Sequence, residues 1–151
     1  MNLSANKKNV TPLAKAMKLL ARRDHSVRKL QQKLKSYYPA HEIEHVIERC
    51  LQENWLNDAR FAESYIRSRS SGGYGPLRIV LELQQKGVEK ETIRLALREA
   101  KIDWQAFLLR LLERRQPLPD DVAARYKLQN ALQRKGFSLD LIQRCLPVTE
   151  I

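Results

Sequence analysis

Apolar residues recur every three or four positions along most of this chain, and no stretch alternates between apolar and polar residues. The first spacing places apolar side chains on one face of an α-helix, whereas strict alternation is typical of a half-buried strand. Glycine and proline interrupt the pattern at intervals, so each helix is short. The pattern predicts an all-α fold of about nine helices, near residues 13–23, 26–36, 40–53, 57–70, 76–86, 89–100, 103–115, 120–135 and 138–146.

Several of these helices begin at residues that favour a helix start. Ser26 and Asp103 are suitable N-caps, because their side-chain oxygens can accept a hydrogen bond from the exposed backbone N–H groups of the first turn. Pro76 follows Gly75 and suits a first helical position.

The apolar pattern also repeats over a longer distance. Two sets of positions are spaced 49 residues apart: Leu30, Ile79 and Leu128, and Leu34, Leu83 and Leu132. Short amphipathic helices can resemble one another by chance, but six positions in register favour true repeats. The period predicts three tandem three-helix repeats that form an elongated, curved array, at residues 12–54, 55–102 and 103–151, after a flexible N-terminal segment at 1–11.

Composition adds a strong positive charge to this picture. Lys and Arg number 28 against 17 Asp and Glu, which gives a formal net charge of +11. Such an excess indicates a polyanionic partner or an acidic protein surface. No apolar run is long enough for a transmembrane helix, and the first residues lack the apolar region of a signal peptide. Cys50 and Cys145 lie far apart and on apolar helix faces, which favours reduced thiols in a cytoplasmic protein.

One string matches a catalytic motif. Residues 41–45 read His-Glu-Ile-Glu-His, the H-E-x-x-H spacing of a zinc hydrolase. Helical geometry places His41 and His45 opposite the apolar side chains of their helix, on the solvent face, and the other repeats carry no equivalent ligands. We therefore interpret the motif as a coincidence and expect no metal, no cofactor and no enzymatic activity.

Basic residues follow the repeat. Lys29, Arg78 and Lys127 are spaced 49 residues apart, and basic pairs lie near the end of the first helix of each repeat. Basic residues near helix C-termini also complement the helix dipole, so part of this pattern can be structural. The alternative is a continuous positive stripe along the array, suited to phosphates or to an acidic groove. Tyr74 either stacks on a base, anchors a protein contact or packs its own turn against a neighbour.

Three stretches resemble the signature segments of the RecX family, whose members are bacterial regulators of the RecA recombinase. They are Leu19–Ser26, Leu56–Ala62 and Gly73–Ile79, and the likeness extends over roughly residues 13–146. Gly-Tyr-Gly-Pro-x-Arg after an Arg-Ser-Arg helix end is the most specific part. The third repeat matches less distinctively.

The resemblance implies three tandem three-helix modules and a non-catalytic regulator that binds the RecA–single-stranded DNA filament. Such a regulator inhibits filament extension, ATP hydrolysis, strand exchange and the co-protease function of the SOS response. The expected partners are the RecA filament and single-stranded DNA, with double-stranded DNA as a further candidate, for a monomer that needs no membrane. The predicted contact residues are Arg22, Arg23, Lys29, Lys33, Arg67, Arg69, Tyr74, Arg78, Arg125 and Lys127. The alternative is a stand-alone DNA-binding protein that uses one helix pair as a helix-turn-helix.

Overall fold

A computed structural model describes residues 10–147 of the chain, and this part is entirely helical. Module 1 contains α2 (Pro12–Arg22), α3 (Val27–Lys35) and α4 (Ala40–Gln52). Module 2 contains α5 (Asp58–Ser71), α6 (Pro76–Gln85) and α7 (Lys90–Ala100). Module 3 contains α8 (Trp104–Glu113), α9 (Val122–Arg134) and α10 (Leu139–Cys145).

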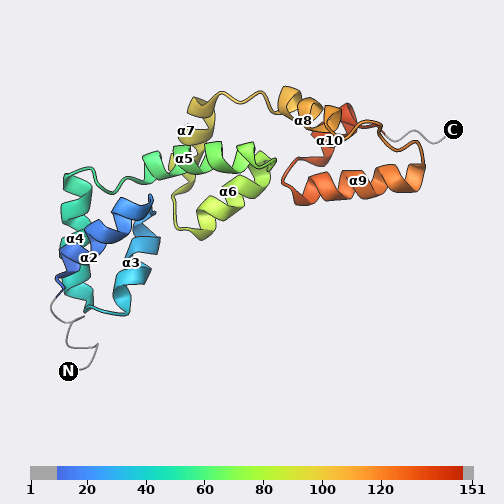
Figure 1. The fold of residues 1–151 in the computed structure, drawn as a ribbon. Coiled ribbons are helices and arrows are strands. Elements are labelled where there is room, and N and C mark those ends of the chain that lie inside the picture. The colour runs from blue at the N-terminus through green and yellow to red at the C-terminus, as the bar shows by residue number, and fades with distance from the viewer. Residues whose placement is uncertain (1–9, 148–151) are drawn as a thin grey trace.

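The modules follow one another along an arch rather than forming one globule (Figure 1). The predicted fold class, three tandem three-helix repeats in an elongated and curved array, is confirmed. The predicted helix ranges differ from the observed ones by no more than two residues at either end. The predicted flexible segment at 1–11 lies almost wholly outside the described residues, as does the end of the third repeat after residue 147.

Helix starts are set by short polar side chains and by proline. Ser26 and Asp103 accept hydrogen bonds from the backbone N–H groups of Lys29 and Ala106, as their N-cap positions predict. Pro76 occupies the first turn of α6 behind Gly75.

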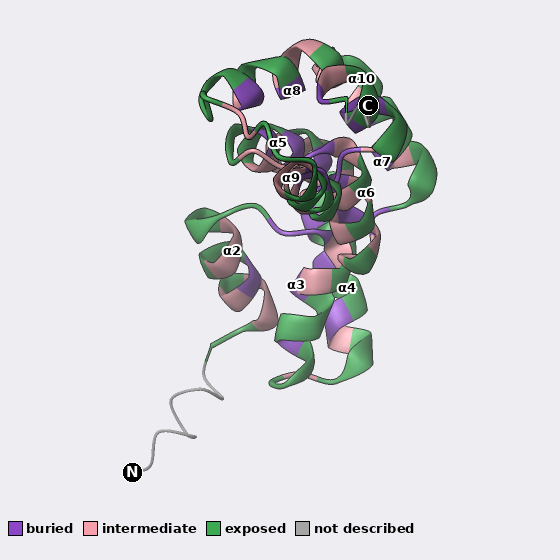
Figure 2. Cartoon of the chain, turned by 90° about the vertical axis from the view of Figure 1, so that its right-hand side faces the viewer, coloured by how far each residue is buried: buried purple, intermediate pink, exposed green. Residues whose placement is uncertain are grey.

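Each module has its own hydrophobic core, and Figure 2 shows the buried residues on the inner faces of the helices. The 49-residue spacing marks core positions: Leu30, Leu34, Ile79 and Leu83 are fully buried, and Leu132 is 3% exposed. Trp104 packs against the cores of both module 2 and module 3, so it is a packing residue at their junction. Because the small core of each module is apolar, the basic side chains lie at the surface and at the junctions.

The H-E-x-x-H motif lies on α4 with the orientation expected from the sequence. His41 and His45 are exposed, whereas Ile43 and Ile47 face the core. Within residues 10–147, no group of three or more His, Cys, Asp or Glu is placed to hold a metal ion. Cys50 and Cys145 are free thiols, and burial raises the pKa of both above the ordinary value. None of the helices described combines the length and apolar character needed to cross a bilayer.

Candidate anion-binding surface at the module junctions

Successive modules meet at two junctions that are built in the same way. At the first junction, between modules 1 and 2, the hydroxyl of Ser26 donates to the carbonyl of Lys86 at 2.7 Å. At the second junction, between modules 2 and 3, the N–H of Gly75 donates to the carbonyl of Lys135 at 2.8 Å. Ser26 and Gly75 are 49 residues apart, and so are Lys86 and Lys135. The start of the second helix in one module therefore docks on the end of the second helix in the next.

A glycine at the end of the second helix makes this close approach possible. Gly136 has φ +107°, and a Cβ there would lie 2.7 Å from the backbone nitrogen of Arg78. Gly87 is its counterpart at the first junction, with φ +86° and the side chain of Arg28 against it. Glycine has no side chain and adopts a positive φ at little cost in free energy, so it meets both requirements.

The second junction encloses the ring of Tyr74 among cations. The guanidinium carbon of Arg69 lies 3.8 Å from the ring centroid, that of Arg78 lies 4.6 Å away, and the Lys135 ammonium lies 4.4 Å away. Because Lys135 belongs to module 3, these cation–π contacts hold modules 2 and 3 together. Of the three roles weighed for Tyr74, packing of its turn against a neighbour is the one that these contacts describe.

Glu82 supplies the negative charge at the second junction. Arg69 donates to its two carboxylate oxygens, at 2.9 Å each, and Tyr65 donates at 3.1 Å. Arg78 adds a longer contact of 3.4 Å. Burial opposes ionisation of Glu82, but the hydrogen bonds from Arg69 and Tyr65 outweigh it and hold the pKa below the ordinary value. Two of the predicted contact residues, Arg69 and Arg78, are therefore already paired with Glu82 within the protein.

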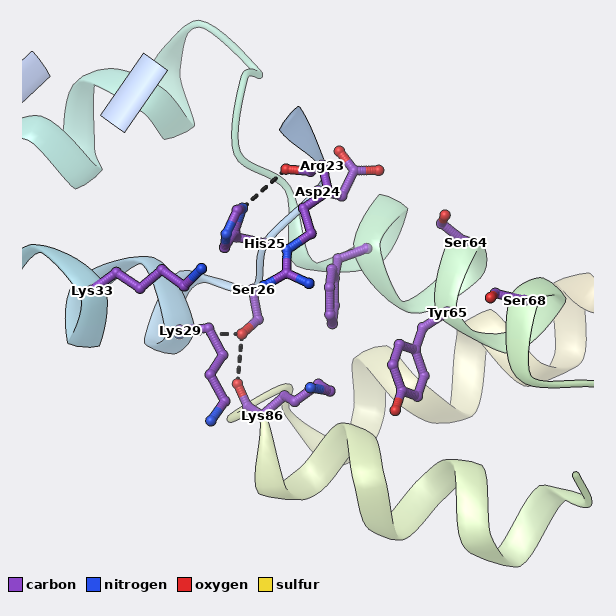
Figure 3. Close-up of a pocket in the computed structure, with 11 residues that line it drawn as sticks. Arg23, Asp24, His25, Ser26, Lys29, Lys33, Ser64, Tyr65, Ser68 and Lys86 are labelled. Atoms are coloured by element: carbon purple, nitrogen blue, oxygen red, sulfur yellow. Dashed lines mark hydrogen bonds between the residues drawn. The ribbon is translucent and has the colours of Figure 1, made fainter. Parts of the chain in front are cut away.

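The first junction contains an open hollow of about 540 Å³ whose lining is more cationic (Figure 3). Its wall carries four cationic side chains, one carboxylate and one imidazole: Arg23, Lys29, Lys33, Lys86, Asp24 and His25. These residues come from the end of α2, from α3 and from the loop after α6, and the hollow also touches one face of α5. Three of the predicted contact residues, Arg23, Lys29 and Lys33, are brought together here.

His25 forms part of the wall of this hollow and is only 6% exposed. Its Nδ1 lies 3.0 Å from the carbonyl of Arg23, and a carbonyl only accepts, so Nδ1 carries the proton. Nε2 is buried and has no hydrogen-bond partner among the described residues. Burial lowers the pKa of His25, the Arg23 carbonyl opposes this, and the positive charge of Lys33 lowers it further.

The other predicted contact residues lie elsewhere. Arg67 and Arg69 point to opposite sides of α5, because Arg67 faces α7 whereas Arg69 faces α6. Arg125 donates to the carbonyls of Pro119 and Pro147, so it holds the connections around α9. Arg22 and Lys127 are exposed at the end of α2 and on α9. A continuous positive stripe along the array would therefore not include both Arg67 and Arg69.

Sequence reasoning did not select Lys86 or give His25 a binding role, although both carry a signal. Lys86 occupies the place of Lys135 in the repeat, and His25 occupies the place of Tyr74. Counting 49 residues from Tyr74 would have marked His25 as a junction residue.

Comparison with known proteins places the chain in a family. Models of the first, second and third three-helix domains of RecX match residues 13–50, 57–97 and 105–146. The regulatory protein RecX of Serratia proteamaculans is 40% identical over an alignment that covers 87% of this chain and 93% of the relative. That of Pseudomonas fluorescens is 40% identical over 134 residues, which cover 87% and 86%.

A solved structure agrees at the level of the fold. The crystal structure of RecX from Lactobacillus salivarius matches with a TM-score of 0.72 and 24% identity, over 93% of this chain and 95% of that one. The three matched domains, the relatives and the order of the helices lead to one conclusion: the chain belongs to the RecX family.

Proposed function

We propose that this protein is a non-catalytic regulator that binds the RecA–single-stranded DNA filament in the cytoplasm and inhibits the recombinase. The inhibited activities would be filament extension, ATP hydrolysis, strand exchange and the SOS co-protease function. Its relatives are named regulatory proteins, which supports a regulatory role for this chain. The protein would act as a monomer whose modules each make a modest contact.

The observation that carries the proposal is the arch of three modules with an uncompensated cationic hollow at its first junction. An extended array can touch several subunits of a filament at once, and linked contacts add avidity without any one of them being strong. Cationic side chains without internal partners are available to DNA phosphates or to acidic protein surfaces. Arg23, Lys29 and Lys33 form no ion pair within residues 10–147.

The test is a recombinase ATPase assay on single-stranded DNA with increasing amounts of the protein. We expect inhibition at or below one protein per recombinase subunit, weakened by Lys33→Glu. Arg69 and Arg78 are unsuitable for charge reversal because they hold the second junction together. The matched control is Lys18→Glu, which makes the same charge change at an exposed site of α2 outside the hollow.

Two results would contradict the proposal. The first is that the folded protein leaves ATP hydrolysis unchanged. The second is that it binds naked duplex DNA as a dimer with defined half-site spacing. The second result would favour the stand-alone DNA-binding protein. Gel shifts on naked DNA, run beside the ATPase assay, separate these outcomes, since non-specific contacts to phosphates weaken steeply with salt.

A further inference from the structure

The first-junction hollow lacks the internal counter-ion that its counterpart contains. Glu82 forms ion pairs with both Arg69 and Arg78 at the second junction. The residue 49 positions earlier, at the same place on α3, is Lys33. The sign of the charge is therefore reversed at this position, and Lys29, the counterpart of Arg78, has no carboxylate to pair with in the part of the chain described.

The one carboxylate at the hollow does not take over this role. Asp24 lies 3.9 Å from Nε of Arg60, and in Figure 3 its carboxylate points away from the lysines. The ammonium of Lys86 lies 5.5 Å from the ring of Tyr65, and within residues 10–147 it forms no ion pair. Several cations held together at a partly enclosed site repel one another, so an external anion would lower their energy.

His25 provides an independent sign of a missing partner. A buried polar atom without a hydrogen bond is rare in folded proteins and calls for an explanation. Nδ1 is occupied by the Arg23 carbonyl, so Nε2 is the atom that is left without a partner. When the ring is protonated, Nε2 becomes a second donor. His25 lines the hollow, so an anion bound there can supply the acceptor that the described residues do not.

We propose that the first-junction hollow binds one phosphate group, which Lys29, Lys33 and Lys86 surround and which accepts a hydrogen bond from Nε2 of His25. A phosphate is compact and offers several strong acceptor oxygens, so it can meet three ammonium groups and one imidazolium together. The hollow, of about 540 Å³, has room for it. Only the source of the phosphate rests on the proposed function, since a filament regulator meets the backbone of single-stranded DNA.

Binding is expected to be linked to proton uptake. The charged groups that face His25 are Arg23 and Asp24 beside it and Lys33 on α3, and Lys29 and Lys86 lie further along the hollow. In the free protein, burial and then Lys33 and Arg23 keep the ring neutral. A bound phosphate reverses the local potential and gives Nε2–H an acceptor, so the imidazolium is stabilised. Proton uptake by His25 therefore favours phosphate binding as the pH falls from 7 toward 6.

The experiment follows the imidazole C–H signals by NMR in the full-length protein, with His25→Gln to assign the His25 signal and exposed His41 and His45 as internal references. Inorganic phosphate is compared with chloride at equal ionic strength. We expect phosphate to raise the pKa of His25, and the signals of His41 and His45 serve only as references. Lys33→Glu places a carboxylate at residue 33, the position that corresponds to Glu82 at the second junction. It should weaken phosphate binding about tenfold or more. Lys18→Glu should weaken it little.

A second arm identifies the source of the phosphate with oligothymidylates that carry a 5′-hydroxyl or a 5′-phosphate. A His25 shift with both oligomers supports a backbone phosphodiester, and a shift with the 5′-phosphorylated one alone supports a terminal phosphate. A shift with inorganic phosphate alone supports a free phosphate as the ligand. The proposal is overturned if phosphate and chloride act alike on His25, or if Lys33→Glu and Lys18→Glu bind phosphate equally. No recombinase is present, so this failure is distinct from failure of the proposed function.

Discussion

The two junctions share a framework and differ in the side chains that surround it. The second junction places an aromatic ring and a carboxylate among its cations, at Tyr74 and Glu82. The first junction has His25 and Lys33 at the same places in the repeat and encloses a hollow. The comparison teaches that one repeated joint can hold its anion within the protein, as at Glu82, or lack one and leave its cations available, as at Lys29 and Lys33.

The largest expected effect concerns the glycine that closes each junction. Gly136→Ala should lower the free energy of unfolding by about 3 kcal/mol, because the new methyl group meets backbone atoms of Arg78 and Gly75 at a residue with φ +107°. Gly87→Ala should cost about 2 kcal/mol, since its main obstacle is the exposed side chain of Arg28. Urea unfolding with Trp55 and Trp104 fluorescence measures both. Equal losses would show that the two junctions are equally tight.

An intermediate effect is expected from the charges. Glu82→Gln should cost about 2 kcal/mol, because it weakens charged hydrogen bonds at a side chain that is 20% exposed. Lys33→Gln should change stability by less than about 0.5 kcal/mol, since no internal partner is lost. The same urea experiment measures both variants.

The dependence of the free energy of unfolding on acidic pH is a second test of the role of Glu82. The pKa of Glu82 lies below its ordinary value of 4.5 in the folded protein. Its stabilisation is therefore fully present above pH 4.5 and is lost as the pH falls through the lowered pKa. The profile of Glu82→Gln should be flatter there than that of the unmodified protein. An unchanged slope would mean that other carboxylates account for the acid sensitivity.

The smallest effect is expected near neutral pH. The folded pKa of His25 is lowered by burial, so the unfolded chain binds a proton near pH 6.5 while the folded ring remains neutral. The free energy of unfolding should therefore decline as the pH falls from 6.5 toward the folded pKa, and His25→Gln should remove this decline. Thermal unfolding between pH 5 and 7.5 measures it. A decline that persists in His25→Gln would place the responsible group elsewhere.

Most of the fold could be predicted from the sequence because local signals agree with the tertiary structure. Apolar spacing locates the helices, Ser26 and Asp103 form their predicted N-caps, and the 49-residue period marks core positions such as Leu34 and Leu83. The opposite directions of Arg67 and Arg69 were also predictable, since residues two apart on a helix are separated by about 200°.

The candidate site was less predictable because charge alone does not reveal a partner. Arg69 and Lys33 are both basic residues on amphipathic helices, yet Arg69 is paired with Glu82 and Lys33 is not. That difference depends on which side chains the packing of α5 on α6 brings together. Arg125 likewise has its acceptors, the carbonyls of Pro119 and Pro147, in two separate connections. Because every residue has a backbone carbonyl, the residue types in the sequence do not indicate which carbonyls accept these hydrogen bonds.

The atoms that link the modules also determine how each link can fail. At the first junction, the links run through the Ser26 hydroxyl and through the Asp58 carboxylate, which accepts from the N–H of Val27. At the second, the N–H groups of Gly75 and Leu77 donate to main-chain carbonyls. Removal of the Ser26 hydroxyl oxygen can therefore loosen the junction between modules 1 and 2. The main-chain hydrogen bonds between modules 2 and 3 cannot be removed by shortening a side chain, but added bulk at Gly136 would displace them.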